Sequence, residues 1–267
     1  MDLGIAGRSF AIFGGTRGIG LAAADALAAD GAQLALIGRD ADHAARVAAE
    51  LAARHGTRVV GISADLTRAD EAEQAVSTAT RVLGPLRGAA VTTGLGPRGQ
   101  RDLLGGSDED WAATFDDVLL GTVRVCRAMV TSLIDSGGGS IVTTAAYSIR
   151  APKAHQFPYA SLKAAVATMT KDLATTYGSR GIRANCVCPG ATETDFLAAF
   201  RVQLADQRGW PVEEALERAM RDDWGMDVAL GRAGTPAEVG DVIAFLLSER
   251  ASYLTGALVN VDGGTNF

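Results

Sequence analysis

Short apolar runs alternate with longer, alanine-rich segments along the chain. Seven apolar runs have the length and residue types of buried strands: SFAIF (9–13), QLALI (33–37), RVVGI (58–62), LRGAAV (86–91), GSIVTT (139–144), IRANCV (182–187) and ALVNV (257–261). Six segments predict helices: 18–30, 41–55, 69–83, 108–134, 157–178 and 236–247. Strands that alternate with helices of this length predict a parallel sheet with helices on both faces.

No Pro/Ser-rich linker and no internal repeat divides the 267 residues. We therefore predict that residues 1–267 form a single α/β domain, a doubly wound Rossmann-type fold with a seven-stranded parallel sheet. One acidic, amphipathic excursion at about 194–235 interrupts the short-loop rhythm and carries Trp210 and Trp224. Long excursions at the carboxyl end of a strand often cover substrates. We expect a helical substrate lid there, with a surface helical pair as the alternative.

Composition narrows the classes of partner. The formal charge of −6 argues against a nucleic-acid surface, which needs a basic stripe. No apolar run approaches the ~20 residues that cross a bilayer, and the N-terminus does not resemble a signal peptide. Cys126, Cys186 and Cys188 are odd in number and form no CxxC pair, so we expect buried thiols and neither a metal site nor a disulfide. A cytoplasmic location, without membrane or nucleic-acid partners, is the expectation.

A glycine-rich turn follows the first predicted strand and precedes a helix. Glycines permit a tight turn and close backbone approach to a pyrophosphate, and the helix N-terminus directs unpaired N–H groups at it. A tight strand-to-helix turn alone can use the same residues, but this place in a βαβ chain favours a dinucleotide. The residues expected to bind it are Gly14, Thr16, Arg17, Gly18, Ile19 and Gly20.

The end of the second strand bears on the choice of dinucleotide. NAD binders usually place a carboxylate there for the ribose 2′-OH, whereas a 2′-phosphate needs room and a guanidinium. Gly38 predicts room, and Arg39 with Arg17 predicts bidentate donors, although both arginines could be solvated surface residues. Asp40 comes one residue late for the NAD role. NADP(H) is therefore preferred and NAD(H) stays possible.

Five segments together resemble the short-chain dehydrogenase/reductase family over essentially the whole chain: FGGTRGIG (13–20), ADL (64–66), YASLK (159–163), IRANCVCPGATET (182–194) and the run from GRAGTPAEV to VDGG (231–264). The resemblance implies that Tyr159 is the catalytic acid/base. Lys163, one helical turn away, would lower the phenol pKa and bind the nicotinamide ribose.

The resemblance also assigns further cofactor contacts. Asp65 and Leu66 would lie at the adenine, where Asp65 could equally cap the following turn, and Gly94 would lie beside the adenosine. The PGATET segment would meet the nicotinamide end through Pro189, Gly190, Thr192 and Thr194, with Thr194 binding the carboxamide.

The chain departs from the family pattern around the reacting oxygen. The family's serine falls at Ala146 and its helical asparagine at Val118; the usual NNAG reads Val91 to Gly94, and Phe13 replaces a threonine. Ser148 is our candidate to supply the missing catalytic hydroxyl, with an ordinary loop serine as the alternative. His155 is a second polar candidate near the substrate, or an exposed loop histidine.

These features predict an NADP(H)-dependent oxidoreductase that interconverts a small-molecule carbonyl and a secondary alcohol. A non-redox lyase or isomerase on the same scaffold, or a non-catalytic cofactor-binding subunit, are the alternatives. Family resemblance suggests a homo-oligomer, a homotetramer or dimer, packed through 108–134, 157–178 and the C-terminal segment. Four aromatic residues suggest an apolar pocket or core packing: Phe115, Phe196, Trp210 and Trp224.

Overall fold

A seven-stranded parallel sheet forms the centre of the protein. The computed structural model describes residues 2–94, 103–152 and 156–265. The strand order is β3-β2-β1-β4-β5-β6-β7, and every neighbouring pair is parallel. The strands are β1 (Ser9–Phe13), β2 (Gln33–Gly38), β3 (Val59–Ser63), β4 (Leu86–Val91), β5 (Gly139–Thr144), β6 (Ile182–Pro189) and β7 (Leu258–Val261). The predicted fold class and all seven strands are confirmed.

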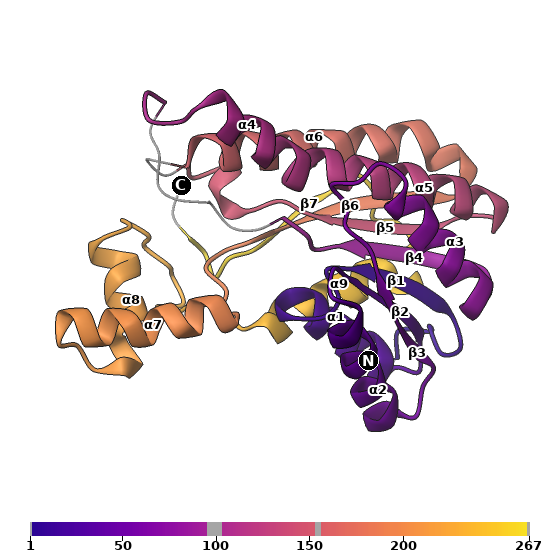
Figure 1. The fold of residues 1–267 in the computed structure, drawn as a ribbon, viewed down its shortest axis with the longest axis horizontal. Helices are drawn as coiled ribbons and strands as arrows, with labels where there is room; N and C mark the ends of the chain where they lie inside the picture. Colours follow the sequence, from indigo (N-terminus) through magenta and orange to yellow (C-terminus); the bar gives the residue numbers. More distant parts are fainter. Residues whose placement is uncertain (1, 95–102, 153–155, 266–267) are drawn as a thin grey trace.

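Helices cover both faces of the sheet (Figure 1). One face carries α1 (Gly18–Ala29), α2 (Ala41–His55) and α9 (Pro236–Leu247). The other carries α3 (Glu71–Leu83), α5 (Gly121–Asp135) and α6 (Phe157–Tyr177). Alternation along β1 sends Phe10 and Ile12 into the first layer and Ala11 and Phe13 into the second, so each strand is apolar on both sides.

The predicted helix 108–134 is not a continuous α-helix. It consists of α4 (Asp108–Thr114), a π-helical stretch (Phe115–Leu120) and α5. A π-helical stretch inserts a residue into the helical register and is frequent at functional sites. At its end, a Cβ on Gly121 would lie 3.3 Å from the Leu66 Cβ, so a glycine lets the helix pass the β3–α3 loop closely.

The excursion at 194–235 contains two helices, α7 (Asp195–Arg208) and α8 (Val212–Asp222). They stand apart from the sheet and its helical layers, beyond the carboxyl ends of the central strands (Figure 1). Leu204, Ala205, Ala215 and Ala219 give the pair a small apolar core of its own. Within the described ranges, no helix combines the length and apolarity needed to cross a membrane.

Candidate active site

Tyr159 and Lys163 lie one turn apart near the start of α6. The Lys163 side chain is 2% exposed, and its Nζ donates to the carbonyl oxygens of Thr144 (2.8 Å) and Thr93 (3.5 Å). The same Nζ lies 5.8 Å from the centre of the Tyr159 ring. Gly94 has a φ of +103°, and a Cβ there would lie 3.2 Å from the ammonium. The ends of β4 and β5 therefore enclose the lysine beside the phenol.

The ionisation of this pair differs from the simple expectation of a lowered phenol pKa. Burial raises the pKa of Tyr159 to about 12, and the nearby Tyr147 adds to the rise. Burial also lowers the pKa of Lys163 to about 8, against the opposing effects of Cys186, Asp117 and Cys188. The protein's own groups thus keep Tyr159 protonated at pH 7, the state that donates a proton.

The turn after β5 contains Ala146, the position where the resemblance expects a serine. Ala146 is extended (φ −160°, ψ 157°) and is followed by the single 3₁₀ turn Tyr147–Ile149. Ser148 is 1% exposed, and its Oγ has no hydrogen-bond partner within the described chain. The hydroxyls of Thr93 and Thr144 are also buried without partners there. Unsatisfied buried hydroxyls cost free energy, so these three hydroxyls would be satisfied by a ligand or water; two of them belong to Thr93 and Thr144, whose carbonyl groups bind Lys163.

Tyr147 is a residue that sequence reasoning missed. It directly follows Ala146, is half-buried, and packs against the apolar cluster Leu216, Met220, Met226 and Ala233 of the helical excursion. Burial raises its pKa, and its phenol acts electrostatically on Tyr159. The only sequence signal was an aromatic residue next to a position where a polar one was expected.

Val118 occupies the position where the resemblance expects an asparagine. It lies in the π-helical stretch, is 1% exposed, and packs with Leu162, Val166 and Tyr159. Its carbonyl oxygen accepts a hydrogen bond from the Thr122 hydroxyl (2.8 Å). The wall of the site beside Tyr159 is therefore apolar at this point.

The glycine-rich turn fits a pyrophosphate. Gly14 (φ +81°) and Gly18 (φ +53°) have left-handed backbones, and a Cβ on Gly14 would lie 2.8 Å from Thr92 Oγ1. A Cβ on Gly20 would overlap the Gly14 carbonyl oxygen. Arg17 is the N-cap of α1 but makes no side-chain capping bond, so the N–H groups of the first turn, Ile19 included, stay open to an anion.

The residues at the end of β2 bear on the choice between NADP(H) and NAD(H). The Arg17 and Arg39 side chains are exposed. Asp40 caps α2 by accepting from the His43 N–H (2.9 Å), so this carboxylate already has a structural role. A Cβ on Gly38 would lie 2.9 Å from Thr16 Cγ2, so the glycine lets Thr16 pack closely against the end of β2.

Asp65 follows β3 and caps the next turn. Its Oδ1 accepts from the N–H (3.0 Å) and hydroxyl (2.8 Å) of Thr67. These bonds, and more weakly the charge of Arg39, hold the pKa of Asp65 below its usual value. The neighbouring Leu66 is nearly buried, and its carbonyl oxygen accepts from Arg124 (2.8 Å). The capping alternative for Asp65 is confirmed, and Arg39 lies in the same neighbourhood.

The PGATET segment connects β6 to the helical excursion. Gly190 donates to the Val261 carbonyl (3.0 Å), and a Cβ there would lie 2.8 Å from the Asp262 Cα, so Pro189 and Gly190 sit tightly against the end of β7. Thr192 pairs with Gly234. Thr194 is the N-cap of α7, and its Cγ2 would lie 3.2 Å from a Cβ on Gly18. The base of the excursion therefore meets the glycine-rich turn.

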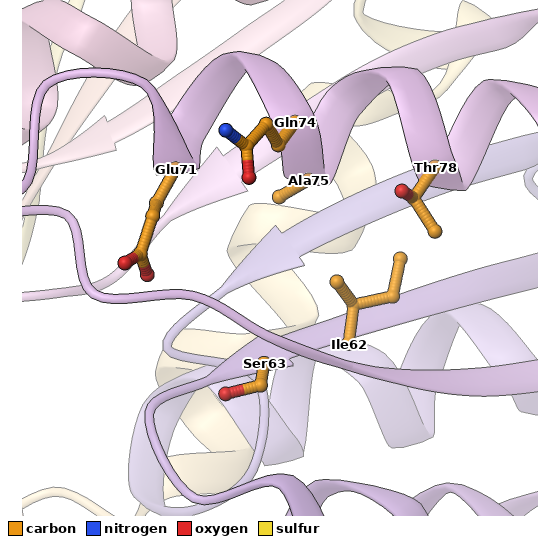
Figure 2. A pocket seen from close by; sticks show the side chains of 6 residues that line it. All are labelled: Ile62, Ser63, Glu71, Gln74, Ala75 and Thr78. Atoms are coloured by element: carbon orange, nitrogen blue, oxygen red, sulfur yellow. The ribbon is translucent and has the colours of Figure 1, made fainter.

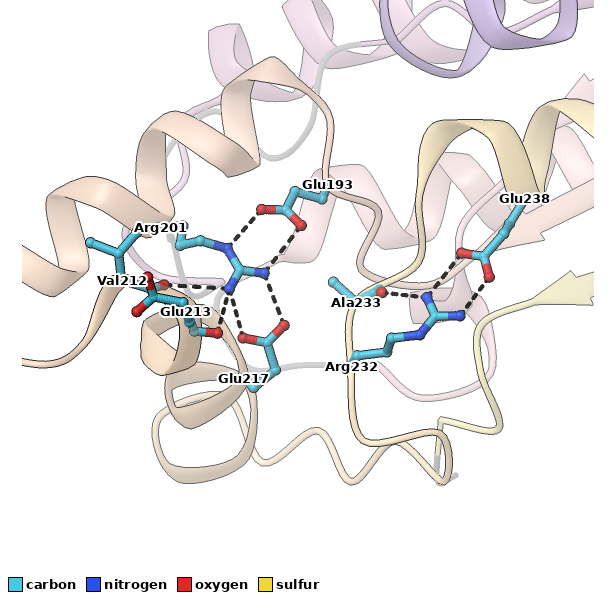
Figure 3. Close-up of polar contacts among 8 residues, drawn as sticks. All are labelled: Glu193, Arg201, Val212, Glu213, Glu217, Arg232, Ala233 and Glu238. Carbon is cyan, nitrogen blue, oxygen red and sulfur yellow. Dashed lines mark hydrogen bonds and ion pairs between the residues drawn. The ribbon is translucent and has the colours of Figure 1, made fainter.

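Two arginines brace the excursion (Figure 3). Arg201 of α7 bonds Glu193 before the helix (Nε to Oε1, 2.7 Å) and Glu217 of α8 (Nη2 to Oε1, 2.9 Å). At the exit, Arg232 bonds Glu238 (Nη2 to Oε1, 2.6 Å), which also completes the capping box of α9. Arg201 thus joins α7 to α8 and to the segment before α7, whereas Arg232 joins the segment after α8 to α9.

The aromatic residues, the histidine and the cysteines singled out in the sequence lie in different parts of the structure. Trp210 and Trp224 pack within the excursion, and Trp224 packs against the same apolar cluster as Tyr147. Phe196 is 80% exposed and Phe115 43%. His155 lies outside the described residues. The three cysteines are buried free thiols, as predicted. A hollow of about 150 Å³ between β3 and α3 is lined by Ile62, Ser63, Glu71, Gln74, Ala75 and Thr78 (Figure 2). It lies at the β3 edge of the sheet, whereas Tyr159 belongs to α6, which packs on β5 and β6.

Comparison with known proteins covers nearly the whole chain. Residues 14–266 match the family described as Enoyl-(Acyl carrier protein) reductase. The chain is 32% identical over 258 residues to 2-(S)-hydroxypropyl-CoM dehydrogenase 3 of Xanthobacter autotrophicus, covering 95% of this chain and 94% of that protein. It is 32% identical over 255 residues to carbonyl reductase family member 4 of Danio rerio, covering 95% of each. L-sorbose reductase from Gluconobacter frateurii, complexed with NADPH and L-sorbose, superposes with a TM-score of 0.91 at 28% identity, covering 99% of this chain and 98% of that one.

Proposed function

The chain belongs to the short-chain dehydrogenase/reductase family of oxidoreductases, and from this premise we propose that it is an NADP(H)-dependent enzyme that interconverts a carbonyl and a secondary alcohol. The observation that carries the proposal is the buried Lys163 ammonium beside the protonated Tyr159 phenol, at the same sheet edge as the glycine-rich turn. A pure binding protein has no need of that phenol.

The proposed cofactor contacts follow the strand ends. Gly14, Thr16, Arg17, Gly18, Ile19 and Gly20 would hold the pyrophosphate, with Asp65, Leu66 and Gly94 toward the adenosine, and Pro189, Gly190, Thr192 and Thr194 toward the nicotinamide. Exposed Arg17 and Arg39 favour a 2′-phosphate, and the capping role of Asp40 disfavours NAD(H). The NADPH in the similar L-sorbose reductase supports the same choice.

In the proposed reduction, each residue has a separate task. Bound NADPH would supply the hydride that the carbonyl carbon accepts. Tyr159 donates its proton to the carbonyl oxygen, and Lys163 provides positive charge beside the phenol as it gives up that proton. Ser148 supplies the hydroxyl that positions the oxygen; its buried, unpartnered Oγ supports this role. The helices α7 and α8 form the substrate lid.

The test follows NADPH consumption at the reduced nicotinamide band with a panel of ketones and diketones. We expect turnover in the native protein and a loss of about 100- to 10,000-fold in Tyr159→Phe, the range for a general acid. NADPH binding without reduction of any carbonyl, and without oxidation of any alcohol by NADP, would refute the redox function.

The same assay tests Ser148. Removing one donor to a reacting oxygen costs about 100- to 1,000-fold in kcat. We therefore expect Ser148→Ala to lower kcat by a factor approaching that range. Adding Ala146→Ser to that variant should restore part of the rate, because it returns a hydroxyl at the family position. Unchanged turnover in Ser148→Ala removes this serine from the mechanism.

We also propose a cytoplasmic homo-oligomer, a tetramer or dimer. Exposed apolar side chains support it at two places: Leu103, Leu104 and Phe115 around α4, and Tyr253, Leu254 and Leu258 at the β7 edge. Sedimentation of the purified protein counts the subunits, and a monomer at micromolar concentration contradicts the proposal.

A further inference from the structure

Two phenols approach the proposed substrate site from different elements. Tyr159 belongs to α6 and packs with Val118, Leu162 and Val166. Tyr147 belongs to the 3₁₀ turn after β5 and packs with residues at the base of the helical excursion and within it. The Tyr147 phenol is near enough to raise the pKa of Tyr159. A molecule at Tyr159 under the excursion therefore lies next to both rings.

The surroundings of Tyr147 leave its hydroxyl available. Its ring packs against an apolar cluster of the excursion, formed by Leu216 and Met220 of α8 and by Met226 and Ala233 after that helix. Among residues 2–94, 103–152 and 156–265, none forms a hydrogen bond with this hydroxyl. Tyrosine hydroxyls in such half-buried, apolar settings usually have a partner. The partner at this place would be an oxygen of the substrate.

The direction of the side chain indicates which oxygen it meets. Successive residues in a 3₁₀ turn point about 120° apart, so Tyr147 and Ser148 leave the turn on different sides. Ser148 is buried in the protein, whereas Tyr147 lies against the apolar cluster of α8 and the segment after it, which includes Leu216 and Met226. In the proposed mechanism, Tyr159 binds the oxygen of the reacting carbonyl. Tyr147 consequently faces the part of the substrate beyond the reacting carbon.

We propose that Tyr147 determines specificity by hydrogen-bonding a second oxygen of the substrate, on the carbon next to the reacting carbonyl. The preferred substrates are then neutral α-hydroxy ketones or 1,2-dicarbonyls. This inference rests on the proposed reductase function and specifies its substrate class. A carboxylate is disfavoured, because the apolar cluster against which Tyr147 packs (Leu216, Met220, Met226 and Ala233) offers no positive charge to pair with it.

A matched pair of substrates tests the assignment: butan-2-one and 3-hydroxybutan-2-one, which differ by one hydroxyl. The native protein should have the higher kcat/KM for the hydroxy ketone. Tyr147→Phe keeps the ring and removes only the hydroxyl, and loss of such a hydrogen bond lowers affinity by about 10- to 100-fold. We expect that loss for 3-hydroxybutan-2-one, and a change below about threefold for butan-2-one since it makes no such bond.

Tyr177→Phe is the control, because Tyr177 is also half-buried but lies at the far end of α6, in the core. Tyr177→Phe should leave kcat/KM unchanged for both ketones. NADPH binding and thermal unfolding of Tyr147→Phe should match the native protein, so that a folding defect is recognised.

The possible results separate the two proposals. An equal loss for both ketones, no loss for either, or a native preference for butan-2-one overturns the role of Tyr147 while the reductase function stands. If the native protein binds NADPH but reduces neither these nor any other carbonyl, the proposed function itself has failed, and the specificity assignment with it.

Discussion

At the scale of single residues, Lys163 is held by two backbone carbonyl oxygens, those of Thr144 and Thr93. Carbonyl groups stabilise an ammonium less than a carboxylate does, so burial prevails and lowers the pKa of Lys163 to about 8. A lysine with a lowered pKa is charged below that pH and becomes neutral as the pH rises through it. The charge beside Tyr159 is therefore sensitive to mildly alkaline conditions.

This predicts the pH dependence of the reduction. kcat/KM, which reports ionisations of the free enzyme, should be level between pH 6 and about 8 and then fall roughly tenfold per pH unit. The measurement is a steady-state profile from pH 6 to 10. Lys171→Met, which removes an exposed lysine of the same helix, should keep the profile. A rate that stays level to pH 10 would show that the charge of Lys163 is not needed or is not lost.

At the scale of elements, the excursion holds together through Arg201. Its side chain is 13% exposed and bonds the carboxylates of Glu193 and Glu217 and the carbonyl of Glu213 (2.8 Å). These partners lie before α7 and in α8, and Thr194 beside them touches the glycine-rich turn. One guanidinium thus joins both helices of the proposed lid to its base.

Arg201→Met should loosen α7 and α8 without unfolding the sheet. Leaving two partly buried carboxylates without a cation costs about 1–3 kcal/mol, which raises amide exchange in Asp195–Asp222 and the KM for the carbonyl substrate. Hydrogen exchange with peptide resolution measures the change in amide exchange, and steady-state kinetics measure the change in KM. Arg208→Met is the control, because its bond to Asp223 is about half exposed and contributes about 0–1 kcal/mol. Equal exchange in both variants would contradict the bracing role.

At the scale of the whole molecule, the proposed cofactor contacts come from the ends of β1, β2, β3, β4 and β6. A ligand that binds so many segments of the folded state stabilises it, by about 2.7 kcal/mol at a hundredfold excess over Kd. A protein of this size gains about 2–4 °C in Tm per kcal/mol. The thermal shift is therefore a measure of which dinucleotide fits.

NADPH should raise the Tm by several degrees, and by more than NADH at the same concentration. Arg39→Asp should reduce or reverse that difference, because it exchanges the guanidinium proposed to bind the 2′-phosphate for a carboxylate that suits a ribose hydroxyl. Arg58→Asp, which changes another exposed arginine just before β3, at the amino ends of the strands, should leave the difference unchanged. A larger shift with NADH in the native protein would refute the preference for NADP(H).

The sequence by itself determined the strands, most of the helices and the glycine-rich turn. Each depends on local patterns: apolar runs such as SFAIF, alanine-rich helical segments, and glycines before a helix. The buried thiols followed from Cys186 and Cys188 lying within an apolar strand. These features depend on neighbours in the chain, which the sequence contains directly.

Only the tertiary structure decided what faces the reacting groups. Three features arise from segments far apart in the sequence: the close packing of Thr16 against Gly38, the burial that raises the pKa of Tyr159, and the packing of Tyr147 against α8 and the segment after it. The π-helical stretch at Val118 likewise breaks a helix whose residues read as continuous. Periodicity gives the face of an element, but the burial and partners of a side chain depend on the surface that packs against it.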